Sequence, residues 1–130
     1  MKRKILSFIL TAFVFHLQAQ INVNKPAPVV GFEPSVIGRN IMDQLNPALA
    51  LTNDQIPKVT ILVGQFLTKK AEFVNQMQSD PDGYRQKFTT LQKTFVDGMK
   101  KALKPAQFSQ FMLLKPAEPD INKPISQLFY

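Results

Sequence analysis

The stretch "IPKVTILVGQFLTKKAEFV", residues 56–74, carries the strongest periodic pattern in this chain. Its apolar side chains recur in alternating steps of three and four residues, which is the spacing of one face of an α-helix. The pattern continues to Met77 and predicts an amphipathic helix over residues 53–78. Lys70 stands where this apolar row would place another apolar residue. Residues 59–63 are rich in β-branched side chains, which favour strands, but they lie inside the longer helical period.

The sequence "SDPDG" at residues 79–83 ends this helix and begins the next, because proline is favoured at the first helical position. The same spacing of apolar residues predicts a second long helix over residues 81–103. Two long helices joined by a short turn are expected to fold back as an antiparallel pair. Two interpretations stay open for the glycines inside them, Gly64 and Gly98: close approach of the two helices, or a bend.

Shorter helices are expected on either side of this pair. Residues 35–45 predict one that Pro47 prevents from continuing, and residues 105–114 predict a last one. We therefore predict an all-α domain over residues 35–114, a small four-helix protomer built on a long antiparallel helical hairpin.

The two ends of the chain are rich in proline. Residues 20–34 contain three prolines and no helical period, so they predict an extended arm. Residues 115–130 form a Pro-rich tail that ends in "QLFY". The apolar side chains of this tail need a docking surface on the domain or on a partner protein.

The first nineteen residues have the three parts of a secretory signal: a basic head at residues 1–4, an apolar run at residues 5–15 and a small residue, Ala19, at the exit. The sequence thus predicts an exported protein, periplasmic or secreted, with no integral membrane segment after cleavage. Sixteen basic residues less the three of the basic head leave thirteen against nine acidic residues, a net charge of +4. This mild basic bias does not predict binding to nucleic acid.

The composition argues against an enzyme. The single histidine, His16, lies within the signal, and the chain has no cysteine, so catalysis by Cys/His or Ser/His and a His/Cys metal site are not expected. Asp80 and Asp82 lie close together, but helix capping explains them. We predict no catalytic residues, no bound metal and no cofactor.

The pentapeptide "LTNDQ", residues 51–55, has the form of a capping box. In this motif the Thr52 hydroxyl accepts a hydrogen bond from the backbone amide three residues on, and the Gln55 side chain reaches back to the Thr52 amide. Leu51 precedes the box as part of a hydrophobic staple. Pro57 fits this start poorly, so an alternative stays open in which Asp54 caps the helix.

A looser copy of the pentapeptide, "LKPAQ", follows at residues 103–107. It keeps Leu103 and Gln107, has Lys104 in place of the hydroxyl residue, and places Pro105 at the first helical position. Both copies are therefore interpreted as helix starts of similar construction, whose chemistry is capping.

An export signal, a small helical chain without cysteine, and these paired motifs resemble the LTXXQ-motif family of periplasmic proteins, the Spy and CpxP group. The resemblance covers residues 35–114. It implies a four-helix protomer, a cradle-shaped homodimer whose concave face is basic with apolar patches, and action as an ATP-independent chaperone or stress-response protein. The metal-sensing branch of the family uses His-rich sites, which this chain lacks outside its signal.

Under this interpretation, unfolded proteins bind a mildly basic, amphipathic helical surface. The candidate client-binding residues are the lysines and large apolar residues of the last two helices: Lys87, Lys93, Lys100, Lys101, Lys104, Phe88, Phe95, Phe108 and Met112. A Phe and Met row at helical spacing also suits an ordinary core.

Two other functions stay open. The chain could be a regulatory or adaptor protein whose tail binds one specific envelope partner, or a peripheral binder of anionic envelope surfaces.

Overall fold

The computed structural model describes residues 31–130, so the predicted signal at residues 1–19 and most of the arm at residues 20–34 lie outside the described residues. The described part is all-helical and contains no strand. It begins with α1 (Pro34–Leu49) and α2 (Gln55–Ala71), continues with α3 (Gln76–Ser79) and α4 (Pro81–Ala102), and closes with α5 (Pro105–Leu113) and the 3-10 helix η1 (Pro124–Leu128). The all-α fold class is confirmed.

The prediction that Pro47 ends the first helix was wrong, because α1 continues through this proline to Leu49. Pro47 stands in the last turn of α1, so the backbone bond that it cannot donate and the crowding of its ring against the preceding turn affect only the end of the helix. Ala50 caps the end of the helix, with a left-handed φ of 48°. The backbone N–H of Leu51 then donates to the Asn46 carbonyl at 3.2 Å, which satisfies an acceptor of the last turn.

The predicted single helix over residues 53–78 is two helices in the structure, α2 and α3. After Ala71 the chain tightens into hydrogen bonds between residues three apart, such as the Phe73 amide to the Lys70 carbonyl at 3.1 Å. Phe73 packs on Tyr84 of α4, with 5.5 Å between ring centroids. This contact with α4 lies at the place where the helix is interrupted between Ala71 and Gln76.

The next two helices follow the predicted ranges within one residue. Pro81 opens α4, and the Asp80 side chain accepts a hydrogen bond from the Gly83 amide at 3.0 Å, as an N-cap does. Pro105 likewise opens α5. Proline suits both places because its missing N–H would have no partner in the first turn of a helix.

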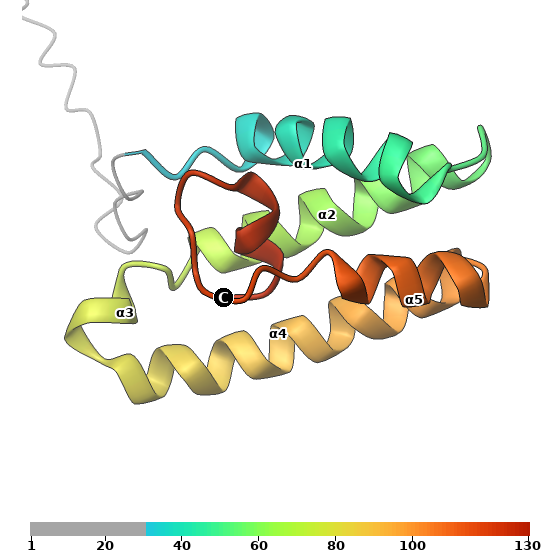
Figure 1. Ribbon diagram of the computed structural model, residues 1–130. Coiled ribbons are helices and arrows are strands. Elements are labelled where there is room, and N and C mark those ends of the chain that lie inside the picture. The colour runs from blue at the N-terminus through green and yellow to red at the C-terminus, as the bar shows by residue number, and fades with distance from the viewer. Residues whose placement is uncertain (1–30) are drawn as a thin grey trace, which may run out of the picture.

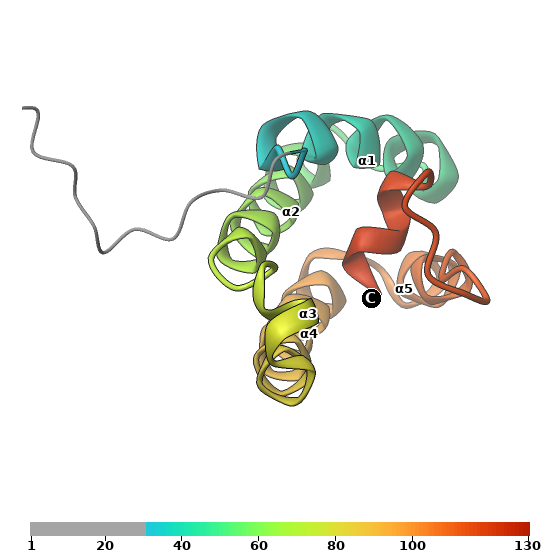
Figure 2. The same ribbon diagram turned by 90° about the vertical axis from the view of Figure 1, so that its left-hand side faces the viewer.

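Four helices surround the C-terminal segment. Helix α2 packs against α1 on one side and α4 on the other, and α5 contacts both α1 and α4. Seen along the helices, α1, α2, α4 and α5 lie around η1, which contacts α1 and α2 (Figures 1 and 2). The tail that was expected to need a docking surface therefore docks on its own domain.

Aromatic rings connect the helices through the core. Phe66 of α2 lies 4.8 Å from Phe95 and 6.0 Å from Phe88, both on α4. Phe95 contacts Phe111 of α5, and Phe111 stacks on Phe129 in the C-terminal segment at 5.4 Å. One continuous row of rings thus joins α2 to the chain's last residues.

The two glycines of the long helices have different surroundings. A Cβ atom added at Gly98 would lie 2.7 Å from the Leu62 side chain, so Gly98 lets α4 approach α2 closely. A Cβ atom at Gly64 would meet nothing within 4 Å. Close approach therefore explains Gly98 and does not explain Gly64.

Candidate functional site

The first pentapeptide motif forms a reciprocal cap at the start of α2. The backbone N–H of Gln55 donates to the Thr52 hydroxyl at 3.3 Å, and the backbone N–H of Thr52 donates to the side-chain Oε1 of Gln55 at 3.0 Å. Helix α2 begins at Gln55, which places Asp54 at the N-cap position, but the Asp54 side chain makes no capping bond. Pro57 therefore falls in the first turn, where its missing N–H costs little.

The second motif makes one of the two hydrogen bonds of this cap, the one in which the glutamine side chain accepts from a backbone N–H. The Lys104 amide N–H donates to Gln107 Oε1 at 2.9 Å. A lysine side chain has no acceptor, so it cannot supply the other half. Leu51 and Leu103, the leucines that open the two motifs, are both buried in the core.

The two motif glutamines also bind each other. Gln55 Nε2 donates to Gln107 Oε1 at 2.8 Å, and Gln107 Nε2 donates to Gln55 Oε1 at 3.0 Å. Each amide nitrogen uses its second N–H on the carbonyl at a helix end: Gln55 on Ala102 of α4 at 3.2 Å, and Gln107 on Leu49 of α1 at 3.0 Å. This glutamine pair joins the ends of α1 and α4 to the starts of α2 and α5, which is a structural role.

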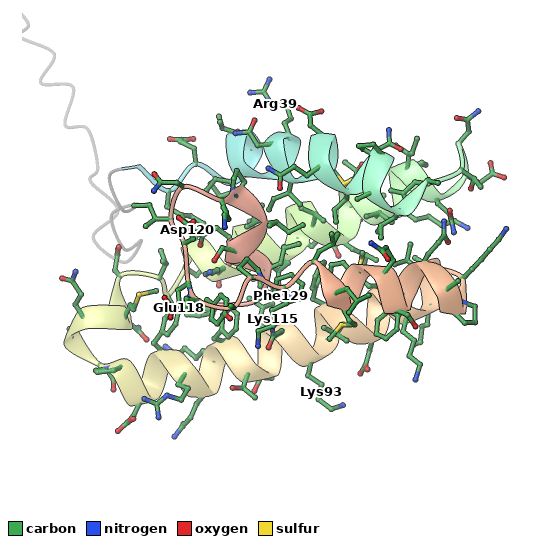
Figure 3. All side chains as sticks on the ribbon, in the orientation of Figure 1. Arg39, Lys93, Lys115, Glu118, Asp120 and Phe129 are labelled. Atoms are coloured by element: carbon green, nitrogen blue, oxygen red, sulfur yellow. The ribbon has the colours of Figure 1, made fainter. Side chains whose placement is uncertain are left out.

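The predicted client-binding lysines are all exposed: Lys87, Lys93, Lys100, Lys101 and Lys104. Two of them have polar neighbours, with Lys93 Nζ 3.4 Å from Asp97 Oδ2 and Lys87 Nζ 2.7 Å from Gln76 Oε1. Lys100 and Lys101 form no ion pair within residues 31–130, so their charges face solvent at the end of α4. Lys93 points away from the core (Figure 3).

The predicted apolar contacts are only partly accessible, and two of them must be corrected. Phe88 and Phe95 belong to the core, because both pack on Phe66, and they cannot contact a client in this fold. Phe108 is half-buried, and Met112 is 42% exposed. The row of phenylalanines on α4 thus faces inward, as such a row commonly does.

A buried lysine, absent from the predicted site residues, holds the C-terminal segment. The side chain of Lys70 is 0% exposed. Its Nζ donates to the Gln127 main-chain oxygen and to Gln127 Oε1, both at 2.9 Å, and also to the Tyr130 main-chain oxygen. It lies 5.1 Å from the centre of the Phe88 ring, within cation–π range.

The surroundings of Lys70 act on its charge in two directions. Burial lowers the pKa of Lys70 from 10.5 to about 7, because an ammonium group loses its hydration in an apolar environment. The three oxygen atoms around Nζ match the three N–H donors of the charged form, so they counteract part of this effect. The sequence did carry a signal for this residue, since Lys70 interrupts the apolar row of α2.

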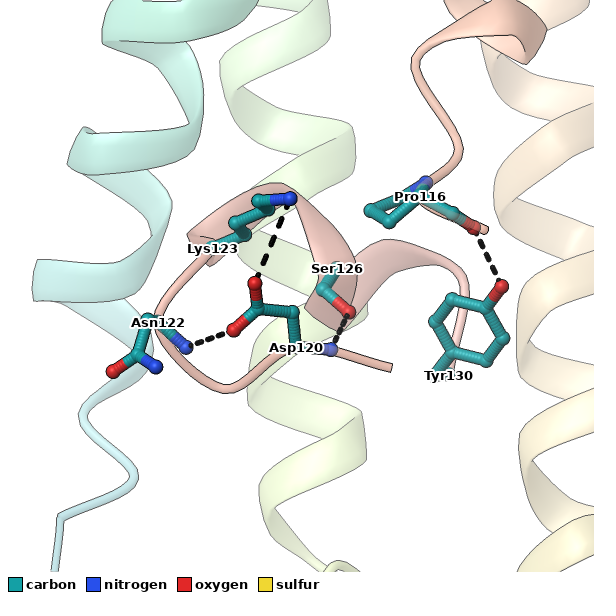
Figure 4. Close-up of polar contacts among 6 residues, drawn as sticks. All are labelled: Pro116, Asp120, Asn122, Lys123, Ser126 and Tyr130. Atoms are coloured by element: carbon teal, nitrogen blue, oxygen red, sulfur yellow. Dashed lines mark hydrogen bonds and ion pairs between the residues drawn. The ribbon is translucent and has the colours of Figure 1, made fainter. Parts of the chain in front are cut away.

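Further bonds fix the segment along its length. Gln92 Nε2 of α4 donates to the Leu128 carbonyl at 3.1 Å. The Tyr130 hydroxyl donates to the Pro116 carbonyl at 2.6 Å (Figure 4), and the Lys115 ammonium lies 5.1 Å from the Tyr130 ring. Local contacts shape the connecting loop, including the Asp120 amide to the Ser126 hydroxyl at 3.0 Å (Figure 4).

Other kinds of site have little support between residues 31 and 130. No group of three or more potential metal ligands lies together in this part of the chain. None of its helices combines the length and the apolar character that crossing a bilayer requires. Comparisons with protein-family models, with curated proteins and with solved structures gave no match to this chain.

Proposed function

We propose that this protein is an exported, ATP-independent chaperone or stress-response protein that binds unfolded clients on an amphipathic, mildly basic helical surface. The observation that supports it best is the set of exposed lysines along α4 and at its end, two of which, Lys100 and Lys101, have no acidic partner among the described residues. Such charges attract acidic polypeptides at long range and raise the rate of encounter.

The features of the sequence agree with this function. The predicted secretory signal at residues 1–19 supports export to the periplasm or the outside of the cell. The paired motifs support the resemblance to the LTXXQ-motif family, which also implies a homodimer. The proposal assigns no catalytic residue, metal or cofactor.

The two alternatives receive different support. An adaptor that binds its partner through "QLFY" would first have to release this segment, because Leu128 and Phe129 are buried in the domain. A binder of anionic envelope surfaces would use the same exposed lysines as the chaperone, so it is the second candidate. It predicts pelleting with anionic vesicles, which a chaperone does not require.

The test is suppression of client aggregation by the protein purified after export, without ATP, at low and at high salt. We expect suppression at near-stoichiometric ratios that weakens with salt, because salt screens exposed charges. Failure to suppress aggregation at either salt, by a protein with its helical circular dichroism intact, would contradict the proposal. Vesicle pelleting measured in parallel separates the second candidate.

A further inference from the structure

The exposed surface offers little continuous apolar area for holding an unfolded polypeptide. The exposed large apolar residues are spread over α1, α2, α3, α5 and the loop before η1: Val36, Ile61, Met77, Met112, Leu113 and Ile121. Surface apolar residues that are scattered in this way are normal and do not mark a binding site.

A larger apolar surface lies beneath the C-terminal segment. Ile125, Leu128 and Phe129 of this segment are 8%, 0% and 5% exposed, and Phe129 stacks on Phe111. The segment lies inside the ring of α1, α2, α4 and α5 (Figure 2), so its release would uncover apolar side chains of the surrounding helices. We call this surface the tail seat: Lys70, Gln92, Phe111 and the faces of α1 and α2 that contact η1.

The tail seat recognises the segment largely through its main chain. Lys70 Nζ binds the main-chain oxygens of Gln127 and Tyr130 and the side-chain Oε1 of Gln127, and Gln92 Nε2 binds the carbonyl of Leu128. Every polypeptide presents main-chain carbonyls, so the bonds to the carbonyls of Gln127 and Leu128 do not depend on sequence. The large side chains that the seat encloses are those of Ile125, Leu128 and Phe129, which are apolar like the residues that an unfolded protein exposes.

The segment is also suited to release. It consists of a 3-10 helix of five residues, a type of helix with poorer hydrogen-bond geometry than the α-helix. The loop that joins it to α5 is mostly exposed and contains Pro116 and Pro119. Release of this segment has to break its contacts with the domain, but it does not require any of the long helices to unwind.

We propose that the tail seat is the client-binding surface of this protein, and that residues 124–130 occupy it as an internal competitor for apolar polypeptide segments. This inference rests on the proposed chaperone function. Because the segment is tethered, its effective concentration at the seat is on the order of millimolar. A client must therefore outcompete the segment, and the exposed lysines raise the client's local concentration.

Two isoleucines of the tail provide a matched pair of variants. Ile125→Ser removes a buried side chain of the docked segment, whereas Ile121→Ser makes the same change at a residue that is 88% exposed. The probes are three fluorescent peptides: NKPISQLFY, which copies residues 122–130, GTPVAEIWA, which keeps only the apolar positions, and the polar GTPSAESSA. Affinity is measured by fluorescence anisotropy on the exported protein.

We expect Ile125→Ser to bind NKPISQLFY and GTPVAEIWA at least tenfold more tightly than the wild type or Ile121→Ser, and to leave GTPSAESSA unbound. Adding Gln92→Ala to Ile125→Ser should weaken both apolar peptides severalfold, because it removes a donor of the seat. Amide exchange in α2 and α4 checks that the domain remains folded. Leu128→Ser is the second release variant if Ile125→Ser unfolds.

Equal affinities in all variants would overturn the inference, and so would a preference of more than a hundredfold for NKPISQLFY over GTPVAEIWA. The aggregation assay separates the two proposals. Suppression that is the same in the wild type, Ile121→Ser and Ile125→Ser overturns the inference and leaves the chaperone function standing. Peptide binding without suppression by any variant overturns the chaperone function and supports the seat as a peptide-binding surface.

Discussion

The side-chain amides of Gln55 and Gln107 form two reciprocal hydrogen bonds, of 2.8 and 3.0 Å, across 52 residues of sequence. Each amide oxygen also accepts the backbone N–H at its own helix start, and each amide nitrogen also donates to the carbonyl at the end of another helix. Every donor of the two amides is therefore used. The repeated motif thus provides two caps that are also a tertiary contact between four helix ends.

Replacing either glutamine by leucine should destabilise the fold. Gln55→Leu leaves the other amide and a backbone donor without partners in a partly buried place, and we expect a loss of about 2 kcal/mol or more in the free energy of unfolding. Gln107→Leu should cost a similar amount. Urea unfolding followed by circular dichroism measures both.

The double variant tests whether the two amides act as one unit. Because each single change already breaks the pair, Gln55→Leu combined with Gln107→Leu should cost less than the sum of the two single changes. Gln65→Leu, at an exposed position of α2, is the control and should change stability by less than about 0.5 kcal/mol. Strict additivity would show that the two caps are independent.

Alanine at the two helix glycines should change stability by different amounts. Gly64 has open space around its Cβ position, so Gly64→Ala should gain up to about 1 kcal/mol from helix propensity alone. Gly98→Ala gains the same propensity but places a methyl group 2.7 Å from Leu62, which must move. We expect it to be the less stable variant in thermal unfolding, and an equal gain at both positions would contradict the close approach of α4 to α2.

Local sequence patterns predicted the helices well and their tertiary relationships poorly. Proline at the first helical position and a capping aspartate or glutamine are local signals, and α4 and α5 begin where these residues stand. The continuation of α1 through Pro47 and the break after Ala71 were missed, because the local sequence indicates a stop at Pro47 and an uninterrupted apolar period past Ala71.

The candidate site shows the same limit. The apolar row on α4 does not by itself show which of its side chains face the core. Phe88 and Phe95 of this row are buried in the structure. Lys70 was visible as a charged residue in an apolar row. Its partners, Gln127 and Tyr130, are 57 and 60 residues away in sequence, and no local period brings them together.

Stability should depend on pH through Lys70. Its pKa is about 7 in the folded protein, where burial lowers it, and 10.5 when it is free. Between these values the unfolded state binds a proton that the folded state does not, so the free energy of unfolding should rise with pH. The slope is at most about 1.4 kcal/mol per pH unit, and the free energy of unfolding levels off below pH 7, where Lys70 is protonated in both states.

Urea unfolding between pH 7 and 9.5 measures this rise. Higher pH is avoided because burial raises the pKa of Tyr84 to about 12, which makes the free energy of unfolding fall once the unfolded tyrosine ionises. Lys70→Met should remove the rise, and Lys69→Met, at the exposed neighbouring position, should keep it. The same slope in wild type and Lys70→Met would show that Lys70 is not the titrating group.

Under the proposed chaperone function, neutralising two exposed lysines should weaken client capture without affecting the fold. Lys100→Gln with Lys101→Gln removes two charges that have no acidic partner among the described residues, so we expect severalfold more protein to be needed to suppress aggregation at low salt. At high salt the variant and the wild type should behave alike, because salt screens the attraction between the lysines and the client.

The control, Arg39→Gln with Lys58→Gln, makes the same change in net charge on α1 and α2. Arg39 of α1 and Lys93 of α4 lie on opposite sides of the molecule (Figure 3). An equal loss in both double variants would mean that net charge, and not the lysines at the end of α4, attracts the client.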